Sequence, residues 1–318
     1  MGKVLHIIAS CTDRKHLPVP EALRLRSIRA VETEARANTW WQRLESHKHP
    51  QGPVHQLYSG EHWSVVLGLP EAARKNGFNP SLWIASAGYG LIPQDAQVRP
   101  YSATFARGQP DSVVRDSENK DTGEQLQRWW KTLSNHAGPA RDQPRTLRQL
   151  ACEQPQANIL IVASPLYVAA ISDDLEFAAK ELQHPERLLV VSSPASLSKG
   201  SLAPHWIPSS AHHQQRLGGS RLGLHARVAR EILLAAQGGH LNAAELRVRY
   251  QKFIKKSAPL RKYDRQLMTD DEVREFIRQV VDEGTKSWSA ALKQLRARQF
   301  ACEQRRFKSL FVQAQENP

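Results

Sequence analysis

The segment Val4–Ala9, with the sequence VLHIIA, runs directly into Ser10–Lys15, with the sequence SCTDRK. The first segment is apolar and rich in β-branched residues, which predicts a buried parallel strand. The second is small and polar, and ligands of open α/β sheets bind just beyond the carboxyl ends of such strands. Asp13 stands there with Arg14 and Lys15, so we expect chemistry at this loop. The alternative is a turn with a local ion pair.

Three later segments repeat this pattern of an apolar strand that ends in small hydroxyl residues. They are Leu82–Ala85, Asn158–Ala163 and Arg187–Ser193, and the serines at the ends of the predicted strands are Ser10, Ser86, Ser164 and Ser192. Helical stretches alternate with the strands, which predicts an α/β fold with a parallel sheet between two helical layers. The four strand-end loops are then expected at one edge of that sheet.

The charge of the chain points to a polyanionic partner. The 318 residues carry a net charge of +13, which favours nucleic acid, with a generic basic protein as the alternative. No apolar run is long enough to span a membrane and no signal peptide is recognisable, so we expect a cytoplasmic protein. The three cysteines lack metal-ligand spacing, which argues against a disulfide framework and a zinc site. No metal or cofactor is predicted.

The chain is expected to form two domains. Residues 1–238 form the α/β domain, in which Pro18–Leu44 is expected to be helical and residues 115–156 to be an insertion with one helix, Thr122–Leu133. Residues 239–318 are expected to be all helical. From Leu241 to Pro318 there are 17 lysines and arginines against 10 acidic residues, a net charge of +7.

The end of the chain has the pattern of a helix-turn-helix. Thr269–Glu272 reads as a capping box, and Gly284 is expected to end the helix that follows. Two short helices separated by a break near residues 298–300 come next, and the second is basic on one face. The predicted phosphate contacts are Arg298, Arg305, Arg306 and Lys308. A solvated basic face on a small helical cap is the alternative.

The candidate chemistry comes from hydroxyl, aromatic and carboxylate side chains in the strand-end loops. They are Asp13, Tyr58, Ser86, Tyr89, Tyr101, Asp111, Ser164 and Tyr167. No nucleophile elbow, Walker lysine or metal-binding set accompanies them. A flipped nucleobase needs aromatic faces and hydroxyl groups, and a carboxylate can stabilise the cationic sugar formed as a base departs. Each residue could instead be structural, as buried tyrosines often are.

A Gly-Gly-Ser-Arg turn, residues 218–221, leads into a helix that carries His225. Such a turn can seat an anion at the start of a helix, so Arg221 and His225 are candidate phosphate contacts. The alternative is a serine cap next to a surface arginine.

A resemblance to known families rests on several of these motifs. Asp13 resembles the water-activating aspartate in the first motif of the uracil-DNA-glycosylase superfamily. Ala163–Leu166 resembles its later His-Pro-Ser-Pro-Leu motif without the histidine. Other motifs resemble a bacterial domain group related to the peroxide-stress protein family, over roughly residues 1–235: Ser10-Cys11, Leu57–Gly60, Ser86–Leu91 and Pro100-Tyr101. With its basic helical tail, the whole chain resembles phage-defence DNA glycosylases that remove glucosylated hydroxymethylcytosine.

The resemblance implies a DNA glycosylase that flips out a modified base of phage DNA and leaves an abasic site. For such a reaction we expect catalysis by Asp13 first and Asp111 second. The residues expected to bind the base are Cys11, Tyr58, Ser86, Tyr89, Tyr101, Ser164 and Tyr167, and Arg14, Lys15, Arg221 and His225 are expected to hold phosphates together with the basic tail. His212, His213 or His225 would replace the missing histidine.

Two other function classes remain open on the sequence. One is a DNA-binding module that recognises a modified base or nucleotide without turnover. The other is an enzyme that acts on a free nucleoside or a tRNA base. Duplex binding through several phosphates weakens steeply with salt, whereas the Michaelis constant of a nucleoside enzyme should depend little on salt.

Overall fold

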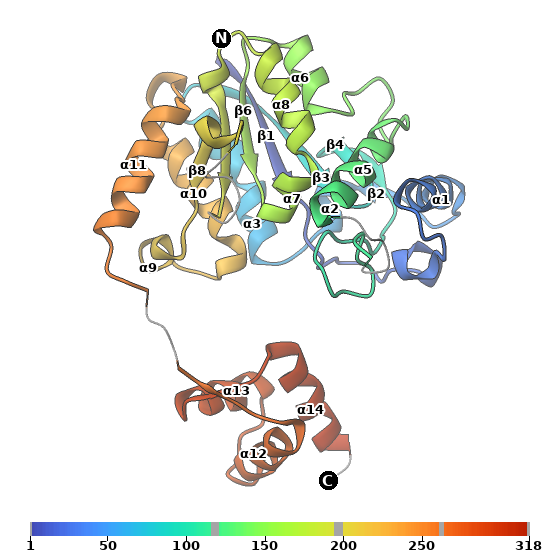
Figure 1. The fold of residues 1–318 in the computed structure, drawn as a ribbon, viewed down its shortest axis with the longest axis vertical. Coiled ribbons are helices and arrows are strands. Elements are labelled where there is room, and N and C mark those ends of the chain that lie inside the picture. Colours follow the sequence, from blue (N-terminus) through green and yellow to red (C-terminus); the bar gives the residue numbers. More distant parts are fainter. Residues whose placement is uncertain (1, 116–120, 194–199, 261–263, 317–318) are drawn as a thin grey trace. The chain divides into compact units, whose positions relative to one another are not determined.

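The computed structural model describes residues 2–115, 121–193, 200–260 and 264–316, together with all but two of their side chains. The chain divides into two compact units, Met1–Ala258 and Pro259–Pro318. The first holds the large sheet, and the second contains α12, α13 and α14 (Figure 1).

The first unit is built on a six-stranded sheet with the order β4-β3-β1-β6-β7-β8. Neighbouring strands are parallel except β3 and β4. The strands are β1 (Lys3–Ser10), β3 (Phe78–Ser86), β4 (Gly90–Pro93), β6 (Asn158–Val162), β7 (Leu188–Ser192) and β8 (Trp206–Pro208). The predicted α/β class, with a mostly parallel sheet flanked by helices, is therefore confirmed. β4 and β8 were not predicted.

Two groups of helices flank this sheet. α10 (Leu224–Ala235) packs on α3 (Glu61–Leu67), α4 (Leu69–Arg74), β6 and β7. In the other group, α1 packs on α5, α5 packs on α7, and α7 packs on α8. Its helices are α1 (Thr33–Ser46), α5 (Thr122–Ser134), α7 (Pro165–Ala170) and α8 (Ser172–Glu181). No helix among the described residues is long and apolar enough to cross a membrane.

β1 lies between β3 and β6 and is buried from Leu5 to Ser10. Its apolar side chains point to both faces, because helices cover a parallel sheet on both sides. Complete burial of side chains such as Leu5 and Ile7 stabilises the fold by about 1.5–3 kcal/mol each. This explains why the strand could be recognised from sequence.

His6 makes β1 sensitive to acid. Its Nδ1 accepts a hydrogen bond of 3.2 Å from the indole N–H of Trp83. Burial lowers the pKa of His6 from 6.5 to about 4, against an opposing hydrogen bond with Gln154. As the pH falls through 6.5, the unfolded chain therefore binds a proton that the folded chain does not yet bind. We expect stability to fall from about pH 6.5 to pH 4, by at most about 1.4 kcal/mol per pH unit for this histidine.

His6→Asn tests this pH dependence. Asparagine keeps a hydrogen-bond acceptor for Trp83 but does not titrate, so the urea unfolding midpoint should depend less steeply on pH. His16→Asn is the matched control, because His16 is exposed, and it should behave as the wild type. Equal steepness in all three proteins would refute a role for His6.

The predicted helix over Pro18–Leu44 is wrong in its first half. Two short 3-10 turns stand there, η1 (Glu21–Leu23) and η2 (Leu25–Ser27), and α1 begins only at Thr33. The backbone pairs with a distant loop instead of with itself: Leu25 N–H donates to the carbonyl of Ser102, and Ser102 N–H donates to that of Leu23, each at 2.8 Å. A tertiary contact therefore replaces the local helix.

The predicted insertion at residues 115–156 is part of the main fold where the structure describes it; residues 116–120 lie outside the described residues. Besides α5 it contains a second helix, α6 (Leu147–Glu153), which packs on α8. Thr146 and Gln149 form a capping box at its start. That motif was the sequence signal for the helix that the prediction missed.

The boundary between the units follows α11 (Ala243–Lys256), later than the predicted boundary at residues 238/239. α11 packs against β8, and Tyr250 is buried with its hydroxyl donating to Glu231 of α10 at 2.7 Å. Much of the positive charge that was predicted for the C-terminal domain therefore belongs to the first unit. Residues 241–258 carry a net charge of +4, and residues 259–318 carry only +3.

The second unit packs three helices around a small core of its own. They are α12 (Asp270–Asp282), α13 (Trp288–Ala297) and α14 (Gln304–Glu316). The expected capping box at Thr269 and the end of the first helix at Gly284, with φ of +93°, are confirmed. The prediction of an all-helical region is corrected by two short parallel strands, β9 (Gln266–Leu267) and β10 (Phe300–Ala301). β10 lies in the connection between α13 and α14, where a tight turn was expected.

Candidate functional site at the carboxyl edge of the sheet

The loops that follow β1, β3 and β6 meet at one edge because these strands are parallel neighbours. Ser10 pairs with Ala85 of β3, and Ala9 pairs with Val162 of β6. The chain therefore leaves all three strands at the same level. This brings Cys11, Ser86 and Tyr167 together although they are far apart in the sequence.

Five predicted base-binding residues form a hydroxyl–thiol network, which we define as Cys11, Tyr58, Ser86, Tyr101 and Tyr167. The Tyr101 hydroxyl lies at its centre, 2.7 Å from Ser86 Oγ and 2.8 Å from the Tyr58 hydroxyl, and donates to Cys11 Sγ at 3.5 Å. The Tyr167 hydroxyl lies 3.0 Å from the same sulfur. The sequence prediction thus selected residues that do gather.

The tyrosine hydroxyls of the network are uncharged at neutral pH, and most of the network is buried. Burial raises the pKa of Tyr58, Tyr101 and Tyr167 well above the ordinary value of tyrosine. Tyr58 and Tyr101 are 1% and 0% exposed, and Tyr89 is 3% exposed with its hydroxyl accepting from Arg99 N–H at 3.0 Å. These three rings therefore offer no open face to a base in this structure.

The glycine-rich segment after β3 was predicted to be a strand-end binding loop, and in the structure it is a tight hairpin. Leu91 and Ile92 belong to β4, which pairs antiparallel with β3. A Cβ on Gly88 would lie 2.4 Å from the Tyr101 ring, so only glycine allows this close approach. Ser86 Oγ accepts from the N–H groups of Gly88 and Tyr89 at 3.2 and 3.0 Å. Gly88 thus serves to pack Tyr101, whereas Gly90, with φ of +74°, lies against Arg145.

Lys15 and Asp13 lie at the outer side of the network. The Lys15 ammonium is 4.7 Å from the centre of the Tyr101 ring and donates to the backbone carbonyl of Asp13 at 3.2 Å. Burial lowers the pKa of Lys15 below its ordinary value, while the charges of Cys11, Asp13 and Asp111 oppose this. The side chain of Asp13 is exposed. Asp13 is thus a solvent-accessible carboxylate three residues beyond the end of β1.

Asp111, the second predicted catalytic residue, is bound in an ion pair. It accepts from Arg26 N–H, Nε and Nη2 at 2.9, 3.0 and 2.8 Å, and from Ser102 Oγ at 2.7 Å. Burial favours its protonated form, but these hydrogen bonds outweigh burial and its pKa lies below the usual value. Both oxygens are occupied, so Asp111 holds the loop around Ser102 in place.

Tyr167 and Ser164 come from the loop after β6. Tyr167 is the one predicted base-binding tyrosine that is partly exposed, and its ring lies 4.7 Å from that of Phe105. Ser164 is partly exposed as well and stands before α7 without capping it. Both residues are accessible from the edge that carries Asp13.

The phosphate contacts predicted in the first unit differ in charge and accessibility. Arg14 and Arg221 are exposed, and Arg221 donates to Gln214 at 3.4 Å. The ring of His225 packs 4.9 Å from that of His62. Burial, reinforced by the charge of His62, lowers the pKa of His225 to about 3. His225 is therefore uncharged at neutral pH and supplies no positive charge to a phosphate.

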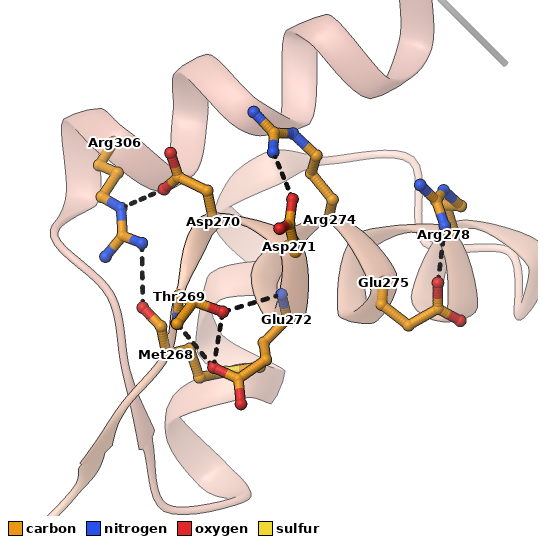
Figure 2. A network of polar contacts seen from close by, with 9 residues as sticks. All are labelled: Met268, Thr269, Asp270, Asp271, Glu272, Arg274, Glu275, Arg278 and Arg306. Carbon is orange, nitrogen blue, oxygen red and sulfur yellow. Dashed lines mark hydrogen bonds and ion pairs between the residues drawn. The ribbon is translucent and has the colours of Figure 1, made fainter.

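Two of the cations predicted to bind DNA in the second unit are engaged within it. Arg306 donates to Asp270 at 2.6 Å and to the carbonyl of Met268 at 2.9 Å, which ties α14 to the start of α12 (Figure 2). Arg298 lies 3.7 Å from Glu283 and 5.3 Å from the centre of the Phe276 ring. The exposed Lys308 lies over Trp288, and the side chain of Arg305 lies outside the described residues.

Sequence reasoning missed two arginines that hold the loops around the site. Arg36 is 2% exposed and donates to the carbonyls of Ser112 and Val113, each at 3.1 Å. Arg145 is 7% exposed and donates to the carbonyl of Tyr89 at 2.6 Å. Both arginines are visible in the sequence, but no local pattern distinguishes a buried arginine from an exposed one.

The fold and the site define the first unit as an α/β domain with an accessible carboxylate at the carboxyl edge of a mostly parallel sheet. Across residues 2–115, 121–193, 200–260 and 264–316, no group of three or more His, Cys, Asp or Glu side chains is placed to hold a metal ion. Comparisons with models of protein families, with curated proteins and with solved structures found no match for this chain.

Proposed function

We propose that the first unit is a cytoplasmic DNA glycosylase that flips out and releases a modified base, with glucosylated hydroxymethylcytosine in phage DNA as the first candidate. The proposal rests on the position of Asp13. The side chain of Asp13 is exposed in the loop that follows β1. Lys15 stands two positions later in the same loop, and Tyr167 lies at the same edge of the sheet. This is the position where open α/β sheets bind ligands.

The proposed reaction is hydrolysis of the N-glycosidic bond. The Asp13 carboxylate orients a water molecule and stabilises the positive charge that develops on the sugar. The bond between C1′ and the base nitrogen breaks with its electron pair leaving on the base, and the water oxygen bonds to C1′. The water proton passes to Asp13, and the Lys15 ammonium stabilises the departing base in place of the missing histidine.

A non-catalytic binding module is the second candidate, and the burial of Tyr58, Tyr89 and Tyr101 favours it. A glycosylase must enclose the base that it has flipped out, and these rings are covered by protein. Under this alternative, the exposed side chains of the edge would recognise the modified nucleotide without turnover.

The deciding experiment compares two DNA substrates. The purified chain is incubated with phage DNA that contains glucosylated hydroxymethylcytosine and with unmodified DNA, and abasic sites and released base are measured. We expect both products from the modified DNA only. Salt-sensitive binding without abasic sites would establish the binding module, and cleavage of free nucleosides with a salt-independent Michaelis constant would establish a nucleoside enzyme.

A further inference from the structure

A basic groove lies on the first unit between α9 (Gln214–Leu217), α10 and α11. Its volume is about 330 Å³, and it is lined by four cations, two aromatic rings and one carboxylate. The cations are Arg216, Arg249, Lys252 and Lys256. The sequence analysis had assigned the charge of this region to a separate helical tail.

The carboxylate in the groove, Glu231, is already neutralised. Arg216 binds both of its oxygens, one of them at 3.0 Å, and Tyr250 donates to it at 2.7 Å. Arg249, Lys252 and Lys256 form no ion pair with any residue that the structure describes, and all three are exposed. The groove thus presents three uncompensated positive charges.

These three cations share one face of α11. They stand at positions i, i+3 and i+7, which are neighbours on a helix surface. With a rise of about 1.5 Å per residue they extend over roughly 10 Å of the helix. This span is longer than a single phosphate group, whereas a duplex carries one negative charge per about 1.7 Å of its axis.

The floor of the groove is packed in place. The Phe253 ring lies 4.8 Å from the Arg216 guanidinium on α9 and 4.8 Å from the ring of His213, which is fully buried. These contacts fix α9 against α11. The backbone of α11 therefore needs little reorganisation when its cations bind a rigid polyanion.

The groove is linked to the candidate site by short contacts. α9 is followed by the turn in which Ser220 N–H donates to Glu61 of α3 at 3.1 Å. The next residue of α3, His62, bonds the backbone carbonyl of Ser10 at 3.1 Å through Nε2. Ser10 ends β1, three residues before Asp13. These contacts join the turn that follows α9 to the end of β1 within the first unit.

We propose that this groove binds the phosphodiester backbone of duplex DNA beside the nucleotide on which Asp13 acts. The inference rests on the proposed function for the identity of that nucleotide. We therefore expect α11 of the first unit to make the main electrostatic contact with the DNA. Arg298 and Arg306 of the second unit are instead engaged in contacts within that unit. Binding through this groove is independent of the base sequence and of base modification.

The test measures affinity of the full chain for an unmodified, fluorescein-labelled duplex of about 30 base pairs by anisotropy, between about 50 and 200 mM salt. The groove variant combines Arg249→Gln, Lys252→Gln and Lys256→Gln. The control variant removes the same charge elsewhere, through Arg74→Gln and Lys75→Gln at the end of α4 and Lys131→Gln on α5, all exposed. Circular dichroism and the thermal midpoint establish that each variant is folded.

We expect the groove variant to bind at least about tenfold more weakly at the lowest salt, with the salt slope reduced by about two to three units. The control variant should stay within about threefold of the wild type, because it loses only long-range attraction. Should the triple groove variant unfold, the pair Lys252→Gln and Lys256→Gln should reduce the slope by about one to two units.

Three outcomes would overturn the inference. The groove and control variants could show equal salt slopes, or the wild type could show no salt-dependent binding to the duplex. The wild type could also bind vesicles of anionic lipid and not the duplex. The test of the groove can fail or succeed independently of the test of the proposed function. Base release with unchanged slopes would refute the groove alone. A reduced slope without any base release would refute the glycosylase alone.

Discussion

Asp13→Asn should reduce base release from modified DNA by about a hundredfold or more, while duplex affinity stays within about twofold of the wild type. Asparagine fills the same space but can neither take the proton of the attacking water nor offset the charge on the sugar. Asp13 is exposed, so the substitution should leave the unfolding midpoint unchanged. The measurements are single-turnover release of the base and anisotropy with the same duplex.

Asp95→Asn is the matched control for this variant. Asp95 is also an exposed aspartate, and it follows β4, the strand that runs antiparallel to β3 and thus away from the carboxyl edge. It should release base at the wild-type rate. A protein with Asp13→Asn that releases base as fast as this control would remove Asp13 from the mechanism and leave the glycosylase proposal without its carboxylate.

Arg145→Met should destabilise the first unit by about 1–3 kcal/mol, the range typical of leaving a buried hydrogen-bond acceptor without its donor. Arg145 Nη2 donates to the carbonyls of Tyr89 and Leu133 at 2.6 and 3.1 Å, and Nη1 donates to that of Leu91. Methionine fills most of the volume but donates no hydrogen bond, so buried carbonyls lose their partner.

The measurement is urea unfolding followed by tryptophan fluorescence. Seven of the eight tryptophans lie in the first unit, so the signal reports almost entirely on it. Arg141→Met, in the same loop but exposed, should shift the free energy of unfolding by less than about 0.5 kcal/mol. Equal unfolding midpoints for Arg145→Met and Arg141→Met would show that the guanidinium contacts contribute nothing to stability.

Arg145 and Arg221 show why the candidate site was only partly predictable. Both are arginines in polar, loop-like sequence, and nothing local distinguishes them. Arg145 is buried against backbone carbonyls and Arg221 is exposed. That difference depends on which segments pack around each residue, so a sequence pattern could not reveal which of them is available to a phosphate.

The sequence by itself determined the elements whose signals are local. β1 and β6 are short apolar runs that only a strand covered on both faces explains, and the capping box at Thr269 and the stop at Gly284 depend on backbone groups a few residues away. The gathering of Cys11, Ser86 and Tyr167 followed from the same signals, because parallel strands deliver their ends to one edge.

Only the tertiary structure decided which of the gathered residues are accessible and which unit each helix joins. Tyr101 is enclosed by Gly88, Tyr58 and Lys15, and Asp111 is occupied by Arg26. The cations of α11 belong to the sheet domain because Tyr250 is buried there. Burial and pairing are properties of the neighbours that a side chain meets after folding, and those neighbours come from segments distant in the sequence.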